Sequence, residues 1–299
     1  MKGRKGRHRL VARSLLVIGL AIAVASPAFA GADQVKLILN APDKAGTPRN
    51  YRSVKKLAAS GSAQFSAKEL AAIRERTGGR PLVVLDLRQE SHGFVDGTAV
   101  SWFGPRDAAN SGKTTEQISR DESTLLAGVA GEQTVTVQKV TGKTADREIG
   151  ETKPVELPVQ SVQSEEDVVR AAGGGYVRVY AADYQPFTDE QVDQLVGFWQ
   201  TRPADAWVHV HCAAGAGRTT QALVLFDALE NAATTSLQDI VDRQKDAGGI
   251  NVLSAKSTPA WRHDGEVARV NLVRRFYQYA KEHSRGEGET WSSWSARNP

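Results

Sequence analysis

The chain has 299 residues with one cysteine, and its 38 Lys and Arg residues against 34 Asp and Glu residues give a formal charge of +4. A single thiol excludes an intramolecular disulfide. Six of the basic residues precede Ala30 and no acidic residue does, so the rest of the chain holds 32 basic and 34 acidic side chains, a formal charge of −2. The basic pI therefore gives no argument for a nucleic-acid partner, and we expect none.

Residues 1–30 predict a secretory signal peptide. Basic side chains up to Arg13 precede an apolar stretch at residues 15–25, and Ala28-Phe29-Ala30 is a small-x-small cleavage site. The alternative is an N-terminal membrane anchor, for which the apolar stretch is short. We expect cleavage after Ala30 and an exported protein, periplasmic or extracellular, with no stable membrane association after cleavage.

The next segments indicate where a folded core begins. Residues 31–60 are polar and rich in turn residues, and we interpret them as a lead-in segment. Ser66 and Glu69 fit a capping box, which predicts a helix ending near Gly78. Residues 81–87 are an apolar run suited to a buried strand.

Residues 104–161 differ from their surroundings in composition. They are rich in Gly, Thr, Ser and charged residues, with short β-like pieces and no persistent helical period. We therefore interpret them as a small β-rich insertion. The main core is then expected from residues 61–103 and 162–299.

The remaining segments alternate strands with helices. Ser164 and Thr188 each begin a capping pattern that predicts a helix. This alternation predicts the α/β fold class, with a central sheet flanked by helices. We expect strands at residues 176–182 and 207–210, and helices at residues 236–247 and 264–282.

The most informative stretch follows residues 207–210, where five residues separate Cys212 from Arg218. At the start of a helix, the dipole and the free backbone N–H groups favour a thiolate, and the same N–H groups bind phosphate. Arg218 is suited to hold two phosphate oxygens, and Thr219 to donate its hydroxyl to the sulfur. The loop interior, expected to contact substrate, consists of Ala213, Ala214, Gly215, Ala216 and Gly217.

Other interpretations of this stretch have less support. One is a buried structural cysteine before a helix. A nucleotide-binding phosphate loop is excluded more firmly, because that loop requires Gly-Lys-Ser/Thr and Arg218 replaces the lysine. We interpret His211 as a strand residue that supports the loop. No His, Asp and Glu cluster has metal-ligand spacing, so we expect no metal and no cofactor.

Displacing an alcohol from phosphorus requires a general acid, and Asp183 is the candidate because it follows a predicted strand and precedes a helix. The other candidates for the general acid, Asp189 and Asp193, lie in a predicted helix, where helix capping or exposure to solvent accounts for an aspartate. The alternative for Asp183 is an aspartate that only stabilises a turn. In the predicted reaction Cys212 attacks phosphorus, Asp183 protonates the leaving alcohol, and water activated by Asp183 hydrolyses the cysteinyl phosphate. We expect a bell-shaped pH dependence on the acid side of neutral.

These motifs resemble the bacterial cysteine phytases, which are protein-tyrosine-phosphatase-like inositol polyphosphate phosphatases. The resemblance implies a protein-tyrosine-phosphatase-like core with a small partial β-barrel, which suits residues 104–161. It also implies Cys212 as nucleophile, Asp183 as general acid, Arg218 as phosphate binder, and a small-molecule myo-inositol polyphosphate, phytate included, as substrate. The matching pieces are residues 86–94, Ala182-Asp183, residues 211–220, Arg243-Gln244, Gly248-Gly249, Phe276-Tyr277, and Trp291-Ser292 with Trp294.

The resemblance suggests further substrate contacts. Arg88 and His92 are expected to help bind substrate phosphates, and Lys256 and Arg262 lie in the segment where the family has phosphate-binding lysines. Tyr184 follows the acid where a histidine is expected, so its contact with the leaving group differs. Two other functions stay open: a protein tyrosine or dual-specificity phosphatase, and a non-catalytic inositol-phosphate-binding module.

Overall fold

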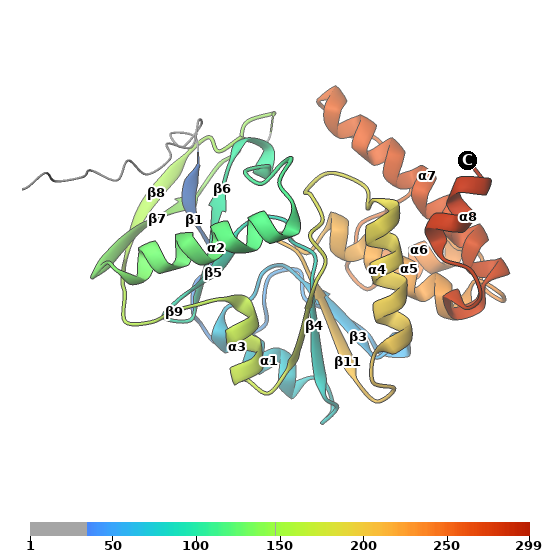
Figure 1. Ribbon diagram of the computed structural model, residues 1–299, viewed down its shortest axis with the longest axis horizontal. Coiled ribbons are helices and arrows are strands. Elements are labelled where there is room, and N and C mark those ends of the chain that lie inside the picture. Colours follow the sequence, from blue (N-terminus) through green and yellow to red (C-terminus); the bar gives the residue numbers. More distant parts are fainter. Residues whose placement is uncertain (1–34, 147) are drawn as a thin grey trace, which may run out of the picture. The chain divides into compact units, whose positions relative to one another are not determined.

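The computed structural model describes residues 35–146 and 148–299, and these form two β-sheets with helices packed against them (Figure 1). The predicted signal peptide, residues 1–30, lies outside the described residues. The α/β class expected from the sequence is confirmed. Among the helices of the described part of the chain, none is long and apolar enough to cross a membrane.

The first sheet has five strands in the order β10-β4-β11-β3-β2, and all neighbours except β2 and β3 are parallel. His211 at the end of β11 is in register with Asp86 at the end of β4 and with Ser62 at the end of β3. The carboxyl ends of these strands therefore meet at one edge, where α/β sheets carry their sites. The strands are Arg52–Val54 (β2), Ala59–Ser62 (β3), Leu82–Asp86 (β4), Gly175–Arg178 (β10) and Trp207–His211 (β11).

Side chains of β11 alternate between two cores, as the pleat of a strand requires. Val208 and Val210 belong to the core that α4, α5 and α7 cover, whereas His209 and His211 pack edge-on against Phe65 on the opposite face. In Figure 1, α1 and α3 lie on one side of this sheet and α4 and α5 on the other. The helices are Ala67–Glu75 (α1), Glu165–Ala171 (α3), Asp189–Thr201 (α4), Gly217–Asn231 (α5), Leu237–Asp246 (α6) and Ala260–Glu282 (α7).

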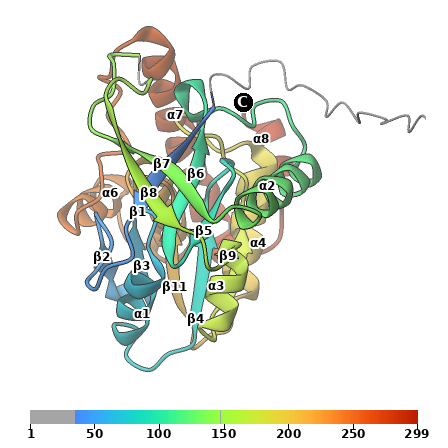
Figure 2. The same cartoon turned by 90° about the vertical axis from the view of Figure 1, so that its left-hand side faces the viewer.

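The second sheet has six strands in the order β8-β7-β1-β6-β5-β9, and it is open rather than a closed barrel within the described residues. Helix α2, Thr115–Ala130, lies against this sheet (Figure 2). Its Leu126 and Val129 belong to one buried apolar cluster with Val100 and Val137 of the sheet. The strands are Lys36–Ala41 (β1), His92–Val95 (β5), Thr98–Phe103 (β6), Thr134–Val140 (β7), Thr152–Pro158 (β8) and Val162–Gln163 (β9).

Two expectations about this region differ from the structure. Residues 104–161 contain α2, although the sequence suggested no helix there; its start is the capping box of Thr114 and Gln117. Its buried face is narrow, so the apolar period is hard to recognise among polar residues. The second sheet also extends beyond residues 104–161, because β1 comes from the predicted lead-in and β5 and β6 from the predicted core.

Most other local expectations are confirmed. The capping boxes of Ser66 and Thr188 start α1 and α4, and Ser236 caps α6. Strand β10 is shorter than residues 176–182, since it ends at Arg178, and α7 starts four residues before the expected Asp264. Short 3-10 turns cover Lys55–Leu57 (η2), Pro105–Asp107 (η3) and Ser284–Gly286 (η4).

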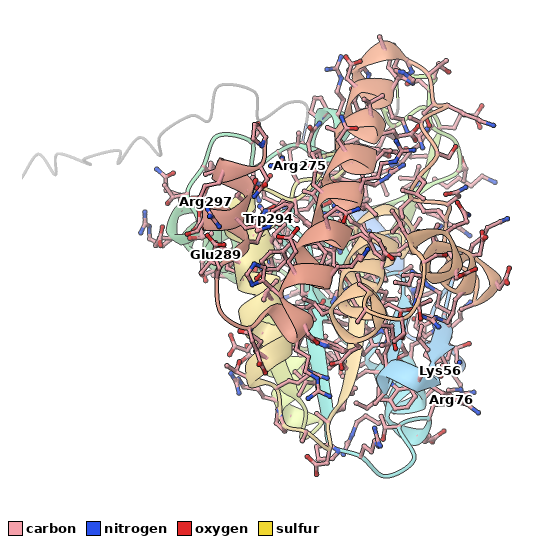
Figure 3. All side chains as sticks on the ribbon, turned by 90° about the vertical axis from the view of Figure 1, so that its right-hand side faces the viewer. Lys56, Arg76, Arg275, Glu289, Trp294 and Arg297 are labelled. Carbon is pink, nitrogen blue, oxygen red and sulfur yellow. The ribbon has the colours of Figure 1, made fainter. Side chains whose placement is uncertain are left out.

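A C-terminal helix, α8 (Trp291–Arg297), fixes the start of α4. The indole of Trp291 donates to Asp189 Oδ1 at 2.7 Å, and the backbone N–H of Ser292 donates to Asp193 Oδ1 at 3.1 Å. Figure 3 shows Arg275 of α7 beside Trp294 of α8. Asp189 and Asp193 thus have structural partners, which removes them as rivals for the general acid.

Candidate active site

The loop between β11 and α5 turns its amides inward for two physical reasons. Gly215 has a φ of 69°, and a Cβ there would lie 2.2 Å from the backbone nitrogen of Ala63, so only glycine fits. Asn50 Nδ2 donates to the carbonyl of Ala214 at 2.8 Å, and Arg52 donates to the carbonyl of Gly215 at 2.7 Å. Because a trans peptide points its C=O and N–H in opposite directions, the N–H groups that follow face the loop interior.

Cys212 lies at the base of this loop. Cys212 is only 2% exposed, and Thr219 Oγ1 donates a hydrogen bond to the Cys212 Sγ at 3.2 Å. A hydroxyl donor stabilises a thiolate more than a thiol. Cys212 lines a pocket together with Ala214, Ala216 and Gly217. Ala213 and Gly215, which were also expected to contact substrate, are not among the residues that line it.

Arg218 is held rigidly at the side of the pocket. Its guanidinium donates to both carboxylate oxygens of Glu90, at 2.7 and 2.9 Å, and to the carbonyls of Leu87 and Ala181. Burial alone would lower the pKa of Arg218, but the carboxylates of Asp183 and Glu90 outweigh burial and raise it well above its usual value. Its Nε has no partner in the described residues, so one donor is left for a ligand.

Asp183 lies in the loop between β10 and α4, where the sequence predicted the general acid. Its Oδ1 is 3.2 Å from the Arg218 guanidinium, and its side chain is 21% exposed. It lines the same pocket as Cys212. The structure therefore brings the predicted nucleophile, phosphate binder and proton donor to one place.

The residue after the acid holds this loop against α7. Tyr184 has a φ of 61°, and its carbonyl approaches Gly265 so closely that a Cβ there would lie 2.4 Å from the oxygen. Its ring meets Trp261 edge-on at 5.5 Å, and the Arg262 guanidinium lies 5.5 Å from the ring centre. The N-terminal turns of α7 thus form the wall of the pocket opposite the Cys212 loop.

The two predicted basic residues of this segment lie in different places. Arg262 lines the pocket, as expected. Lys256 is exposed and is not among the lining residues; its backbone N–H donates to Glu266 Oε2. Arg269, two turns after Arg262, also lines the pocket, and no local sequence pattern marked it as a site residue.

Arg88 was expected to bind a substrate phosphate, but the structure places it away from the pocket. Arg88 is fully buried and does not line the pocket. Its guanidinium donates to Gln64 at 2.6 Å and Asn40 at 3.0 Å and lies 3.5 Å from Glu90. The family resemblance suggested that Arg88 binds a substrate phosphate, but this strand end turns into the protein, where Arg88 lies beside the Glu90 carboxylate that holds Arg218.

His92 was also expected to help bind substrate phosphates. The structure places it outside the pocket, with only 1% of the residue exposed. Its Nε2 is 3.3 Å from Asp86 and 3.2 Å from Glu165. Burial would lower the pKa of His92, but Asp86 dominates and raises it to about 9. Glu165 is in turn 2.6 Å from Nε2 of His211, the strand residue before the nucleophile. A buried charged network therefore lies beneath the loop.

One carboxyl group of the site was missed. Asp107 ends η3 with a φ of 61°, is 8% exposed, and its Oδ1 has no hydrogen-bond partner among the residues described. It lies within 4.8 Å of Glu90 and Asp183. Burial, followed by these two negative charges, raises the pKa of Asp107 well above its usual value. The sequence signal was a polar turn directly after a buried strand.

Two groups in the described residues have the spacing of cation ligands. One is Glu90, Asp107 and Asp183, and the other is Asp86, Glu165 and His211. Arg218 already pairs with two members of the first group, and Arg178 lies 3.1 Å from Asp86 in the second. These guanidinium groups compete with a metal for the carboxylates, and the expectation of no metal stays a prediction.

The fold and the Cys212 loop define a cysteine-based phosphate site of the protein-tyrosine-phosphatase type. A family model for PTP-like phytases, described as inositol hexakisphosphate, matches residues 85–229. A PTP-like phytase structure from Bdellovibrio bacteriovorus is 35% identical, with a TM-score of 0.74, over 88% of this chain and 95% of its own. The PTP-like myo-inositol phosphatase from Mitsuokella multacida, solved with myo-inositol-(1,3,4,5)-tetrakisphosphate, is 30% identical with a TM-score of 0.82, over 89% of this chain and 48% of its own.

This chain belongs to the PTP-like phytase family. The effector protein hopD2 of Pseudomonas syringae pv. tomato is also similar, with 31% identity over 237 residues, which is 78% of this chain and 50% of that protein. The chain thus spans about half the length of the Mitsuokella and Pseudomonas relatives.

Proposed function

We propose that this protein hydrolyses phosphomonoesters of myo-inositol polyphosphates, phytate included, through a cysteinyl-phosphate intermediate. The observation that carries the proposal is the meeting of Cys212, Arg218 and Asp183 in one pocket, with Thr219 hydrogen-bonded to the sulfur. Family membership and a Mitsuokella relative bound to an inositol tetrakisphosphate support the substrate class.

The first step transfers a phosphoryl group to sulfur. The inward-facing loop amides and the Arg218 guanidinium bind the three equatorial oxygens, while the Cys212 thiolate attacks phosphorus in line with the ester bond. Asp183, protonated, gives its proton to the leaving alcohol. Glu90 keeps Arg218 in place throughout, because two charge-assisted hydrogen bonds fix the plane of the guanidinium.

The second step releases phosphate. Water enters the position that the alcohol has left, and the Asp183 carboxylate removes its proton as the water oxygen bonds to phosphorus. The S–P bond breaks, and Thr219 stabilises the thiolate that leaves. The cycle ends with inorganic phosphate, a Cys212 thiolate and a protonated Asp183.

The wall of the pocket supports a polyanionic substrate. Besides Asp183 and Arg218, the charged side chains that line the pocket are Arg262, Glu266 and Arg269. Glu266 is already engaged, since it accepts from the backbone of Lys256 and from the backbone and hydroxyl of Ser257. Arg269 is engaged as well, since it donates to the backbone carbonyls of Val252 and Ser254 at 3.2 and 2.9 Å. Arg262 is therefore the arginine proposed to meet a phosphate next to the one being cleaved.

The test compares phytate with a monophosphorylated aryl ester. Arg262→Ala is expected to raise KM for phytate about tenfold and to leave KM for p-nitrophenyl phosphate within about twofold, because only phytate carries outlying phosphates. Lys256→Ala, which removes an exposed charge outside the pocket, is the matched control with little effect on either. Equal effects of Arg262→Ala on both substrates would remove the argument for a polyphosphate.

We also propose that the chain is exported and that its signal is removed after Ala30, on the support of the basic, apolar and small-x-small pattern of residues 1–30. N-terminal sequencing of protein secreted by a bacterial host is expected to begin at Gly31. A product that keeps residues 1–30 and sediments with membranes would favour the anchor instead.

A further inference from the structure

Glu266 is a carboxylate in the wall of a pocket that we propose takes a polyanion. One face of α7 borders this pocket, with residues at the three- and four-residue spacing of a helix face: Arg262, Gly265, Glu266 and Arg269. A negative charge on that face opposes the binding of phosphate groups. A pocket built for phosphates alone would not contain it, so Glu266 indicates that part of the substrate is not a phosphate.

The hydrogen bonds of Glu266 leave it one acceptor position. An ionised carboxylate accepts about four hydrogen bonds. Oε2 of Glu266 accepts from the backbone N–H groups of Lys256 and Ser257 at 3.0 and 2.9 Å, and Oε1 accepts from the Ser257 hydroxyl. Burial would raise the pKa of Glu266, but these hydrogen bonds outweigh burial and lower it. Glu266 is therefore ionised near neutral pH, and Oε1 has one position left for a donor.

The arginine on the same face does not take this position. The guanidinium of Arg269 donates to the backbone carbonyls of Val252 and Ser254 at 3.2 and 2.9 Å. Glu266 itself is only partly buried and lines the pocket. The free position of its carboxylate is therefore available to a ligand in the pocket.

The chemistry of the free position selects one kind of ligand group. A phosphate monoester above its second pKa of about 6 is a dianion that only accepts hydrogen bonds. A hydroxyl of an inositol ring is neutral and donates one. We propose that Glu266 accepts a hydrogen bond from a ring hydroxyl next to the phosphate being cleaved, so that inositol phosphates with a free hydroxyl there are preferred to phytate. This inference rests on the proposed function and narrows its substrate class.

Glu266→Gln separates this role from a structural one. A structural role would be to hold the turn at Lys256 and Ser257 against α7. Glutamine keeps those bonds, because its oxygen accepts from both N–H groups and its amide donates to the Ser257 hydroxyl. Its second amide hydrogen then points where the carboxylate accepted. The substitution thus replaces a charged acceptor with a neutral donor, which suits a phosphate and not a hydroxyl.

The experiment compares kcat/KM at neutral pH for phytate and for myo-inositol-(1,3,4,5)-tetrakisphosphate, which retains free ring hydroxyls. We expect the unmodified protein to prefer the tetrakisphosphate about tenfold, because phytate must place a dianion beside Glu266. Glu266→Gln is expected to raise kcat/KM for phytate about tenfold and to lower that for the tetrakisphosphate about threefold. Its thermal midpoint is expected within about 2 °C of the unmodified protein, since the turn keeps its hydrogen bonds.

Asp264→Asn is the matched control. Asp264 lies two residues before Glu266 on α7, is exposed and does not line the pocket. Its replacement changes the net charge by the same amount at nearly the same place in the chain. Solvent and salt screen an exposed charge, so the ratio of the two kcat/KM values is expected to stay within about twofold.

Each outcome decides one claim. Preference of the unmodified protein for phytate, a measurement that needs no variant, would overturn the assignment of Glu266. So would a ratio that Glu266→Gln leaves unchanged, or an equal shift of the ratio in Asp264→Asn. Hydrolysis of p-nitrophenyl phosphate without release from either inositol phosphate would instead overturn the proposed function.

Discussion

Replacing Glu90 with glutamine tests what holds the phosphate-binding arginine. The Glu90 side chain is 1% exposed, and its two oxygens accept from both terminal nitrogens of Arg218 at 2.7 and 2.9 Å. Burial alone would raise the pKa of Glu90, but Arg218 dominates and lowers it to about 2. Glu90→Gln keeps the shape, removes the charge, and turns an N–H donor towards the guanidinium.

The size of the effect follows from burial. Removing one partner of a buried ion pair leaves the other charge uncompensated, which costs about 3–5 kcal/mol. Asp183 is still 3.2 Å from Arg218, and the glutamine oxygen still accepts one hydrogen bond, so the lower value applies. We expect Glu90→Gln to lower the free energy of unfolding by about 3 kcal/mol, on the order of 6 °C in Tm.

The assay is urea denaturation with kinetics on the same preparations. Glu166→Gln is the matched control, because Glu166 pairs with Arg170 at 2.7 Å while the two side chains are 49% and 58% exposed. That pair is expected to contribute no more than about 0.5 kcal/mol. Glu90→Gln should also lower kcat/KM at least about tenfold, since Arg218 loses its orientation. Equal stability losses in the two variants would refute the account of Arg218.

Three further predictions concern the loop, the buried network and the acid. Gly215→Ala should destabilise the protein by several kcal/mol and abolish turnover, since its methyl would overlap the backbone of Ala63. The control is Gly197→Ala in α4, where a Cβ would meet no described atom within 4 Å. Gly197→Ala should stabilise the protein by about 0.5–1 kcal/mol in thermal denaturation. The pKa of His92 is raised to about 9, so its contribution to stability is complete below about pH 6.5 and is lost towards pH 9. The pKa values of Asp86 and Glu90 are lowered to about 2, so their contributions are complete above about pH 4 and are lost towards pH 2. Urea midpoints should therefore peak between about pH 5 and 6.5, and a peak above pH 9 would contradict the assigned charge of His92. Gly265→Ala should displace the carbonyl of Tyr184 and lower turnover of alkyl phosphates more than of p-nitrophenyl phosphate, whose leaving group needs little protonation; equal losses would show that the loop does not position Asp183.

Local signals predicted much of the fold and the centre of the site. A capping box, a β-branched run and a Cys-x5-Arg loop each depend only on residues that are close together in the sequence. Helices α1 and α4, strand β4 and the Cys212 loop could therefore be predicted. Asp183 was also predictable, because an acid between a strand and a helix lies at the same sheet edge as the loop.

What could not be predicted depends on contacts between distant residues. Residues 86–94 were recognised by their resemblance to a family motif, but whether Arg88 and His92 face substrate or the interior depends on Gln64 and Glu165, which lie elsewhere in the sequence. Strand β1 joins a sheet with β6 and β7, pairings that no local pattern contains.

The most direct test of the central claim is phosphate release from phytate and from a phosphotyrosine peptide, measured side by side with Cys212→Ser and Asp183→Asn. We expect release from phytate well above release from the peptide, abolished by Cys212→Ser and strongly reduced by Asp183→Asn. Release from the peptide alone would keep the mechanism and contradict the substrate, making the chain a protein tyrosine phosphatase. Release from neither under reducing conditions would contradict catalysis and favour an inositol-phosphate-binding module.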